Sequence, residues 1–346
     1  MRIAVDAMGG DRAPEVVIEG VVEALKSSKE HLEIYLTGEQ QIIESCLPRT
    51  DRVKIVHAPE VIGADESPGA TLRKKTNSSI GVAIGLQKEK KVDAFVSAGN
   101  TGAIMAFSLF ALGRLEGVVR PSLASFFPTL RGYIIVLDVG ANTDCKPANL
   151  LQFAVMGSIY VQNVLDKSNP KVALLNIGEE STKGNELTQK TYRMLENSGL
   201  NFIGNIEGRD ILTGEADVIV CDGFVGNVIL KFTESLKDLL INYLGIYMRK
   251  EPRIRMGASL LSPFFEDFKS KLNYEQYGGA PLLGIDGITI VCHGNSSSEA
   301  IRNAIFVANQ CAERRINKKI EDKLQALLGS VGETEAGRAQ VAKPEQ

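Results

Sequence analysis

The chain has 346 residues, of which 44% are hydrophobic and 23% charged, and 39 Lys and Arg against 42 Asp and Glu give a net charge of −3. This apolar content with so little net charge excludes an intrinsically disordered chain. An isoelectric point near 5.8 argues against a nucleic-acid-binding protein, whose phosphate contacts need a basic surface.

Short β-branched runs alternate with longer amphipathic segments along the chain. The predicted strands are 2–6, 32–36, 53–57, 94–97, 123–127, 134–138, 171–177, 218–221 and 288–292. The predicted helices include 13–27, 78–87, 102–112, 150–165 and 185–198. Strands alternating with helices predict βαβ units, and nearly continuous apolar runs such as YIIVLDV indicate parallel strands buried on both faces. We therefore expect a three-layer α/β/α sandwich around a mostly parallel sheet.

The strand pattern stops between Val228 and Leu272, where helical patterns cover 228–250 and 263–272. They flank a predicted loop that contains the adjacent leucines Leu260 and Leu261. A helical hairpin placed late in an α/β chain is typical of an arm for dimerisation or docking.

The expected organisation is one α/β/α domain over residues 1–327, with this helical arm for dimerisation or docking inserted at 228–275. Residues 328–346 are poor in apolar side chains and predict a disordered tail. The N-terminal residues lack the basic and apolar regions of a signal peptide, and the five dispersed Cys show no CxxC or metal-ligand spacing. We expect a cytoplasmic protein with reduced thiols and no metal site.

Gly and Asn occupy the carboxyl ends of five predicted strands, each time just before a helix. The five segments are Gly99-Asn100-Thr101-Gly102, Gly140-Ala141-Asn142, Gly178-Glu179-Glu180, Asp222 to Asn227 and His293-Gly294-Asn295. Glycine lets backbone N–H groups approach a ligand, and a helix N-terminus attracts anions. Because open α/β sheets bind ligands at this edge, the five loops predict a site for a phosphate-like anion. The alternative is that Gly and Asn only cap helices and turn corners.

No pair of glycines is separated by a single residue and no Gly precedes a Lys-Ser or Lys-Thr pair, which excludes the common dinucleotide and NTP phosphate loops. Lys183 follows an apolar strand and precedes a helix, where its charge can neutralise a phosphate or a developing oxyanion. It could equally be a solvated lysine paired with Glu179 or Glu180.

Eight motifs in the same order resemble the phosphate acyltransferases of bacterial phospholipid synthesis. They are DAMGGD at Asp6, SAGNTGA at Ser97, LDVGAN at Leu137, LNIGEE with KGNE within 174–186, GNIEGRD at Gly204, CDGFVGNVILK at Cys221, YGGAPLLG at Tyr277 and HGNSS at His293. The resemblance covers residues 1–311 and implies an architecture like that of the isocitrate and isopropylmalate dehydrogenases and the phosphotransacetylases.

The resemblance also implies the activity: reversible transfer of a fatty acyl group from acyl-acyl carrier protein to inorganic phosphate. The acyl phosphate would supply an integral-membrane glycerol-3-phosphate acyltransferase. The family implies a homodimer that needs no organic cofactor and associates peripherally with the membrane. The apolar tip of its arm, here around residues 258–261, would contact lipid.

A thioester is already activated, so positioning and oxyanion stabilisation can suffice without a protein nucleophile. We expect Lys183, Asn100 and His293 to serve in catalysis. We expect substrate contacts from Gly99, Thr101, Gly102, Asn142, Glu179, Asp222, Asn227 and Asn295, and membrane contacts from Leu260 and Leu261.

Three alternatives stay open at this point. A phosphotransacetylase acting on acyl-CoA shares the chemistry. A decarboxylating dehydrogenase shares the architecture but needs a metal-binding Asp cluster and substrate arginines that cannot be assembled from this sequence. A non-catalytic peripheral membrane scaffold could be built on the arm alone.

Overall fold

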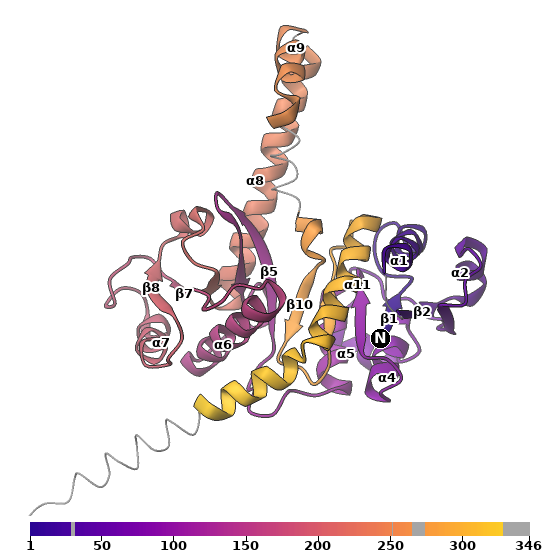
Figure 1. Cartoon of the computed structure of the whole chain (residues 1–346), viewed down its shortest axis with the longest axis horizontal. Helices are drawn as coiled ribbons and strands as arrows, with labels where there is room; N and C mark the ends of the chain where they lie inside the picture. Colours follow the sequence, from indigo (N-terminus) through magenta and orange to yellow (C-terminus); the bar gives the residue numbers. More distant parts are fainter. Residues whose placement is uncertain (29–31, 251, 265–273, 328–346) are drawn as a thin grey trace, which may run out of the picture.

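A computed structural model describes residues 1–28, 32–250, 252–264 and 274–327 (Figure 1). Its strands form one sheet in the order β3-β2-β1-β4-β11-β10-β5-β6-β9-β7-β8. The strands are β1 (Arg2–Asp6), β2 (Glu33–Gly38), β3 (Val53–His57), β4 (Ala94–Ser97), β5 (Ser122–Thr129), β6 (Gly132–Leu137), β7 (Val172–Leu175), β8 (Phe202–Ile206), β9 (Val218–Val220), β10 (Ala280–Leu283) and β11 (Thr289–Val291). The sequence-based prediction missed β8 and β10.

Helices connect most of these strands. They are α1 (Glu15–Ser27), α2 (Gln40–Cys46), α3 (Pro68–Lys74), α4 (Ser79–Lys88), α5 (Thr101–Ala111), α6 (Pro147–Val164), α7 (Glu186–Glu196), α8 (Gly223–Lys250), α9 (Pro252–Leu260) and α11 (Ser298–Glu313). Two 3₁₀ turns, η1 (Gly208–Thr213) and η2 (Tyr274–Tyr277), and a further helical segment at 316–327 also belong to the described residues.

The sheet consists of two halves. The strands within each half are parallel to one another, and the two halves run in opposite directions. Strands β3, β2, β1, β4 and β11 pair in parallel, and so do β6, β9, β7 and β8. Three antiparallel pairings separate the halves: β11 with β10, β10 with β5, and β5 with β6. The predicted mostly parallel sheet is confirmed. The expectation that all five Gly/Asn loops leave one edge is wrong, because β4 and β11 run in the opposite direction to β6, β9 and β7.

Helices cover both faces of the sheet, which confirms the predicted α/β/α layers. Helices α4, α5 and the first turns of α8 pack on one face, and α1, α11, α6 and α7 pack on the other. Strand β1 shows the alternation that this requires: Ala4 is buried under α4, while Ile3 and Val5 are buried under α1 and α11.

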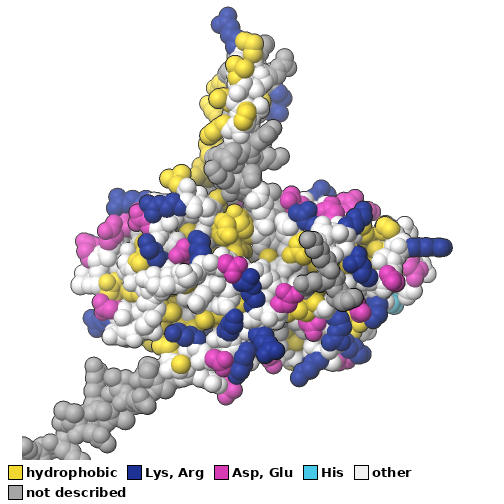
Figure 2. Space-filling model, viewed as in Figure 1, with side chains coloured by type: hydrophobic (Ala, Val, Ile, Leu, Met, Phe, Trp, Pro, Cys, Tyr) yellow, Lys and Arg dark blue, Asp and Glu magenta, His cyan; other side chains and the backbone are white. Residues whose placement is uncertain are grey.

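Helix α8 extends from the body as the predicted arm, and α9 lies against it (Figure 1). Its 28 residues give a length of about 42 Å. Figure 2 shows hydrophobic side chains along the arm, and the exposed ones include Phe232, Leu236, Leu239 and Leu240. No helix in the described part of the chain is both long enough and apolar enough to span a bilayer.

The predicted loop between the two arm helices is wrong. Residues Pro252–Leu260 form α9, which starts at a proline, a residue favoured in the first helical position. Leu260 is therefore the last residue of a helix, and Leu261 follows it in a turn. Most of the second predicted arm helix, at 265–272, and the predicted disordered tail at 328–346 lie outside the described residues.

Candidate active site

The loops that follow β1, β4 and β11 contact one another and form the first wall of the site. Ser97 Oγ donates a hydrogen bond to the buried carboxylate of Asp6 at 2.7 Å and accepts one from Gly99 N at 2.9 Å. Asp11 N donates to Gly294 O at 2.7 Å. A side chain at Gly9 would place its Cβ 2.7 Å from Gly99 N, so the DAMGGD motif needs glycine for this close approach.

Burial of the Asp6 carboxyl raises its pKa, and its hydrogen bonds to Ser79 and Ser97 oppose that rise. The network holds the loop that ends at Asn100, directly before α5. The Asn100 Oδ1 caps α5 by accepting from Ala103 N at 2.9 Å, and Nδ2 donates to the carbonyl oxygens of Gly63 and Ala64. The amide of Asn100 therefore positions the N-terminus of α5.

The loops that follow β6 and β9 form the second wall. The buried carboxylate of Asp138 accepts from Gly140 N at 3.2 Å, from Ala141 N at 2.9 Å and from Asn142 Nδ2 at 2.6 Å. Desolvation by burial outweighs these bonds and raises the pKa of Asp138 to about 6. Gly226 in α8 packs so closely against this loop that a Cβ would lie 1.8 Å from Asp138 O.

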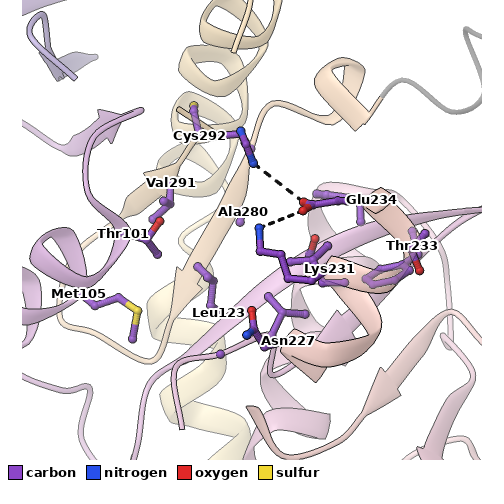
Figure 3. A pocket seen from close by; sticks show the side chains of 18 of the residues that line it. Thr101, Met105, Leu123, Asn227, Lys231, Thr233, Glu234, Ala280, Val291 and Cys292 are labelled. Carbon is purple, nitrogen blue, oxygen red and sulfur yellow. Dashed lines mark hydrogen bonds and ion pairs between the residues drawn. The ribbon is translucent and has the colours of Figure 1, made fainter. Parts of the chain in front are cut away.

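A cavity of about 490 Å³, here called the main cavity, lies between the two walls (Figure 3). Its apolar lining is Met105, Leu123, Phe126, Phe127, Pro128, Val139, Leu230, Ala280, Val291 and Cys292. Its polar lining is Thr101, Ser125, Asn227, Lys231, Thr233, Glu234, Lys237 and His293, with Gly102, Gly140 and Gly279. The lining is thus largely apolar, while Thr101, Asn227 and the charged groups provide hydrogen-bonding capacity.

Glu234 lies between two groups that can carry positive charge. Its Oε2 is 2.9 Å from Lys231 Nζ, and its Oε1 is 4.0 Å from His293 Nε2 (Figure 3). Lys231 is 59% exposed and Glu234 is 29% exposed. A lysine, a histidine and the N-terminus of α5 in one cavity form an arrangement that attracts anions.

The sequence analysis missed Lys231 and Glu234 because it assigned this helix to the arm. The available signal was their spacing: Asn227, Lys231 and Glu234 stand at i, i+4 and i+7, one face of a helix that follows a strand-end loop. The same helix therefore supplies the cavity at its start and the arm at its end.

The structure brings four of the predicted site residues into the main cavity: Thr101, Gly102, Asn227 and His293. Asn142 instead lines a neighbouring cavity of about 760 Å³, which also contacts Gly102.

The other predicted residues lie outside both cavity linings. Asp222 caps α8 by accepting from the backbone N–H groups of Phe224 and Val225. Lys183 and Glu179 are exposed in the loop between β7 and α7. Gly99 lies against the Ser97 and Asp6 side chains, and the carbonyl of Asn295 accepts a hydrogen bond from Arg12.

Burial also decides the chemistry of the cavity thiol. Cys292 is buried, and desolvation raises its pKa to about 12, so it is a neutral thiol at physiological pH. Among the described residues, no group of three or more His, Cys, Asp or Glu is placed to hold a metal ion.

Solved structures with this fold include acyl-transferring enzymes. The EutD phosphotransacetylase of Staphylococcus aureus aligns with a TM-score of 0.57 at 17% identity, and a phosphotransacetylase of Streptococcus pyogenes with 0.58 at 18%. Each alignment covers 90% of this chain and 94% of the other. At these identities the similarity establishes the α/β/α fold alone.

Residues 1–319 match the model of the fatty acid synthesis protein family, and the chain belongs to that family. The chain is 50% identical over 336 residues to the phosphate acyltransferase of Heliobacterium modesticaldum, covering 96% of this chain and 100% of the relative. It is 48% identical to the phosphate acyltransferase of Desulforamulus reducens, covering 94% and 98%. The expected family and the expected acyltransferase enzyme are confirmed, so the non-catalytic scaffold is excluded.

Proposed function

We propose that this chain reversibly transfers a fatty acyl group from acyl-acyl carrier protein to inorganic phosphate. The product, acyl phosphate, would serve glycerol-3-phosphate acylation in phospholipid synthesis. The observation that carries the proposal is the composition of the main cavity, whose lining combines apolar side chains suited to a hydrocarbon chain with hydrogen-bonding and cationic groups. A small dianion fits the second part and a fatty acyl chain fits the first.

Phosphate binds at the N-terminus of α5, against the Thr101 hydroxyl and the first backbone N–H groups. Lys231 neutralises part of its charge, and Asn227 and His293 add hydrogen-bond donors from the other sides. An oxygen of hydrogen phosphate attacks the thioester carbonyl carbon. The new C–O bond forms, the C–S bond breaks, and the proton of hydrogen phosphate ends on the departing thiol.

The protein supplies position and charge in this reaction and forms no bond to the acyl group. The protonated Cys292 supports direct transfer, because a neutral thiol is a poor nucleophile. In this proposal Lys231 and the α5 N–H groups stabilise the negative charge that develops on the carbonyl oxygen. Such electrostatic stabilisation is usually the largest part of the rate enhancement.

The arm fits the proposed homodimer and peripheral membrane contact. Phe232, Leu236 and Leu240 recur at i, i+4 and i+8 and are exposed, which makes an apolar stripe suited to a second copy of the chain. Leu260 is 80% exposed and Leu261 54% exposed at the far end of α9, where they would enter lipid. A peripheral location would deliver acyl phosphate to a membrane glycerol-3-phosphate acyltransferase.

The test is to mix the purified protein with palmitoyl-acyl carrier protein and follow free carrier thiol with and without phosphate. We expect thiol release only with phosphate, together with a hydroxylamine-reactive acyl phosphate. The same assay with palmitoyl-CoA separates the alternative phosphotransacetylase, which would prefer the CoA thioester. No phosphate-dependent release from either donor would refute the proposed reaction.

A further inference from the structure

The cavity of about 760 Å³ beside the main cavity has no role in the reaction described above. We call it the arginine groove; its lining is Gly102, Met105, Ala106, Leu109, Arg114, Val119, Arg120, Pro121, Ala141 and Asn142. It shares Gly102 and Met105 with the main cavity. The first turns of α5 therefore line both cavities, next to the proposed phosphate position.

The charged residues that line the arginine groove are all basic. Arg114 and Arg120 are both in its lining, and none of its lining residues is acidic. Arg114 donates Nη1 to the carbonyl oxygen of Val119, which holds its guanidinium across the loop. Arg120 is exposed and has no hydrogen bond or ion pair with any other residue that the structure describes.

The rest of the arginine groove is apolar. Leu109 is 43% exposed and Val119 is 48% exposed, and Met105, Ala106 and Pro121 continue this surface toward Gly102. An elongated ligand with an uncharged body and one anionic end matches this distribution. Guanidinium groups bind phosphate oxygens with paired, charge-assisted hydrogen bonds.

We propose that the arginine groove binds the phosphopantetheine arm of the acyl donor, with its phosphodiester against Arg114 and Arg120. This inference rests on the proposed function, because an acyl-acyl carrier protein carries its thioester on that arm. The thioester lies at Gly102 and Met105, and the acyl chain continues into the main cavity. Phosphate approaches the thioester from the α5 N-terminus, so donor and acceptor use different openings.

Two thioesters that differ only in the phosphate provide the test: decanoyl-4′-phosphopantetheine and decanoyl-pantetheine. In the wild-type protein we expect KM for the phosphorylated thioester to be about tenfold lower, as one charge-assisted interaction implies. The double variant R114Q/R120Q should bring the two KM values together by raising the KM for the phosphorylated thioester, while the KM for decanoyl-pantetheine stays as in wild type.

The matched control is R49Q/R52Q beside β3, a strand at the edge of the sheet. Arg52 donates to the carbonyl oxygen of Leu25 as Arg114 does to Val119, and Arg49 is exposed as Arg120 is. This control should keep the tenfold ratio. A wild-type protein that does not distinguish the thioesters, or an R114Q/R120Q variant that keeps the ratio, overturns the proposal.

Carrier-protein binding is the competing explanation for the two arginines. If R114Q/R120Q loses turnover with decanoyl-acyl carrier protein but keeps the ratio between the small thioesters, the arginines contact the carrier surface and the proposal is wrong. Calorimetric titration with 4′-phosphopantetheine and with pantetheine measures the same preference without turnover. A wild-type protein that turns over neither thioester but binds 4′-phosphopantetheine through Arg114 and Arg120 would therefore refute the proposed reaction and retain the arginine groove.

Discussion

The charge of Lys231 offers the sharpest test of the main cavity. Replacing it with methionine keeps most of the apolar stem and removes the ammonium group that lies 2.9 Å from Glu234 Oε2. If this group neutralises phosphate and stabilises the carbonyl oxygen, its loss leaves the Glu234 carboxylate facing the anion without the neighbouring lysine charge. We therefore expect Lys231→Met to lower turnover rather than stability.

The structure sets the size of both effects. Lys231 pairs with Glu234 at i and i+3 on α8 and is 59% exposed, so the pair contributes at most about 0.5 kcal/mol to folding. Removal of one charge-stabilising donor from an active site costs about 10²- to 10³-fold in kcat. Because Lys231 is largely exposed, we expect the lower value, about 10²-fold.

The assay is phosphate-dependent release of carrier thiol from palmitoyl-acyl carrier protein, with thermal unfolding measured on the same preparations. Lys190→Met is the matched control, since Lys190 is 60% exposed and pairs with Glu186 on its own helix, far from the cavity lining. Turnover of Lys231→Met within about threefold of wild type, or an equal loss in Lys190→Met, would refute the assignment.

Three further predictions concern Glu234, Asp138 and Gly226. Glu234→Gln removes a negative charge beside the anion position and should lower the KM for phosphate about three- to tenfold in steady-state assays. Asp138 has a folded pKa of about 6 against an ordinary value of 3.8, so the folded protein binds more protons between these values and loses stability as the pH rises. The unfolding free energy of wild type minus that of Asp138→Asn should therefore fall by up to about 3 kcal/mol from pH 4 to pH 7 in denaturant titrations. Gly226→Ala places a Cβ 1.8 Å from Asp138 O and should destabilise the protein by several kcal/mol, about 3 or more, whereas Gly85→Ala meets no atom within 4 Å and should leave the melting temperature unchanged or higher.

Each of these predictions has a contrary outcome. A higher phosphate KM in Glu234→Gln would place the anion away from that carboxylate. A pH-independent difference, or one that rises with pH, would contradict the burial argument for Asp138. Equal melting temperatures for the Gly226 and Gly85 variants would show that α8 can move away from the β6 loop at little cost.

Local sequence patterns predicted those strands whose burial is visible in the residues themselves. The run at β6 is apolar because both of its faces are covered, and its predicted end differs from the observed end by one residue. Strand β10 was missed because Pro281 and the preceding Gly278-Gly279 are typical of a turn. Its extended form depends on pairing with β5 and β11, which are distant in sequence.

Strand direction escaped the prediction for a different reason. Periodicity reports which faces are buried and carries no information about whether two strands run parallel. One signal was present: only six residues, 128–133, separate the predicted strands 123–127 and 134–138, too few for a crossover helix. That gap indicates a hairpin, and β5 and β6 form one.

The site residues likewise fall into those that a local sequence pattern predicts and those that depend on tertiary packing. Thr101, Asn227 and His293 were predicted because a strand end followed by a helix is a local pattern. Lys231 and Glu234 reach the cavity only because α8 packs across the sheet face, which depends on the reversed half of the sheet. Lys183 satisfied the local pattern, but its strand β7 lies beyond β9 and away from the cavity.

The order of strands has a consequence for synthesis of the protein. Strands β10 and β11 come last in the chain, yet they lie between β4 and β5 in the sheet. While a ribosome is still translating the arm, β4 and β5 each expose an unpaired edge that can pair with other nascent chains. The same late segment supplies Ala280, Val291 and His293 to the main cavity. A chain terminated before residue 280 would thus lack two central strands of the sheet and part of the site. We expect premature termination to yield inactive and aggregation-prone fragments rather than a partly active enzyme.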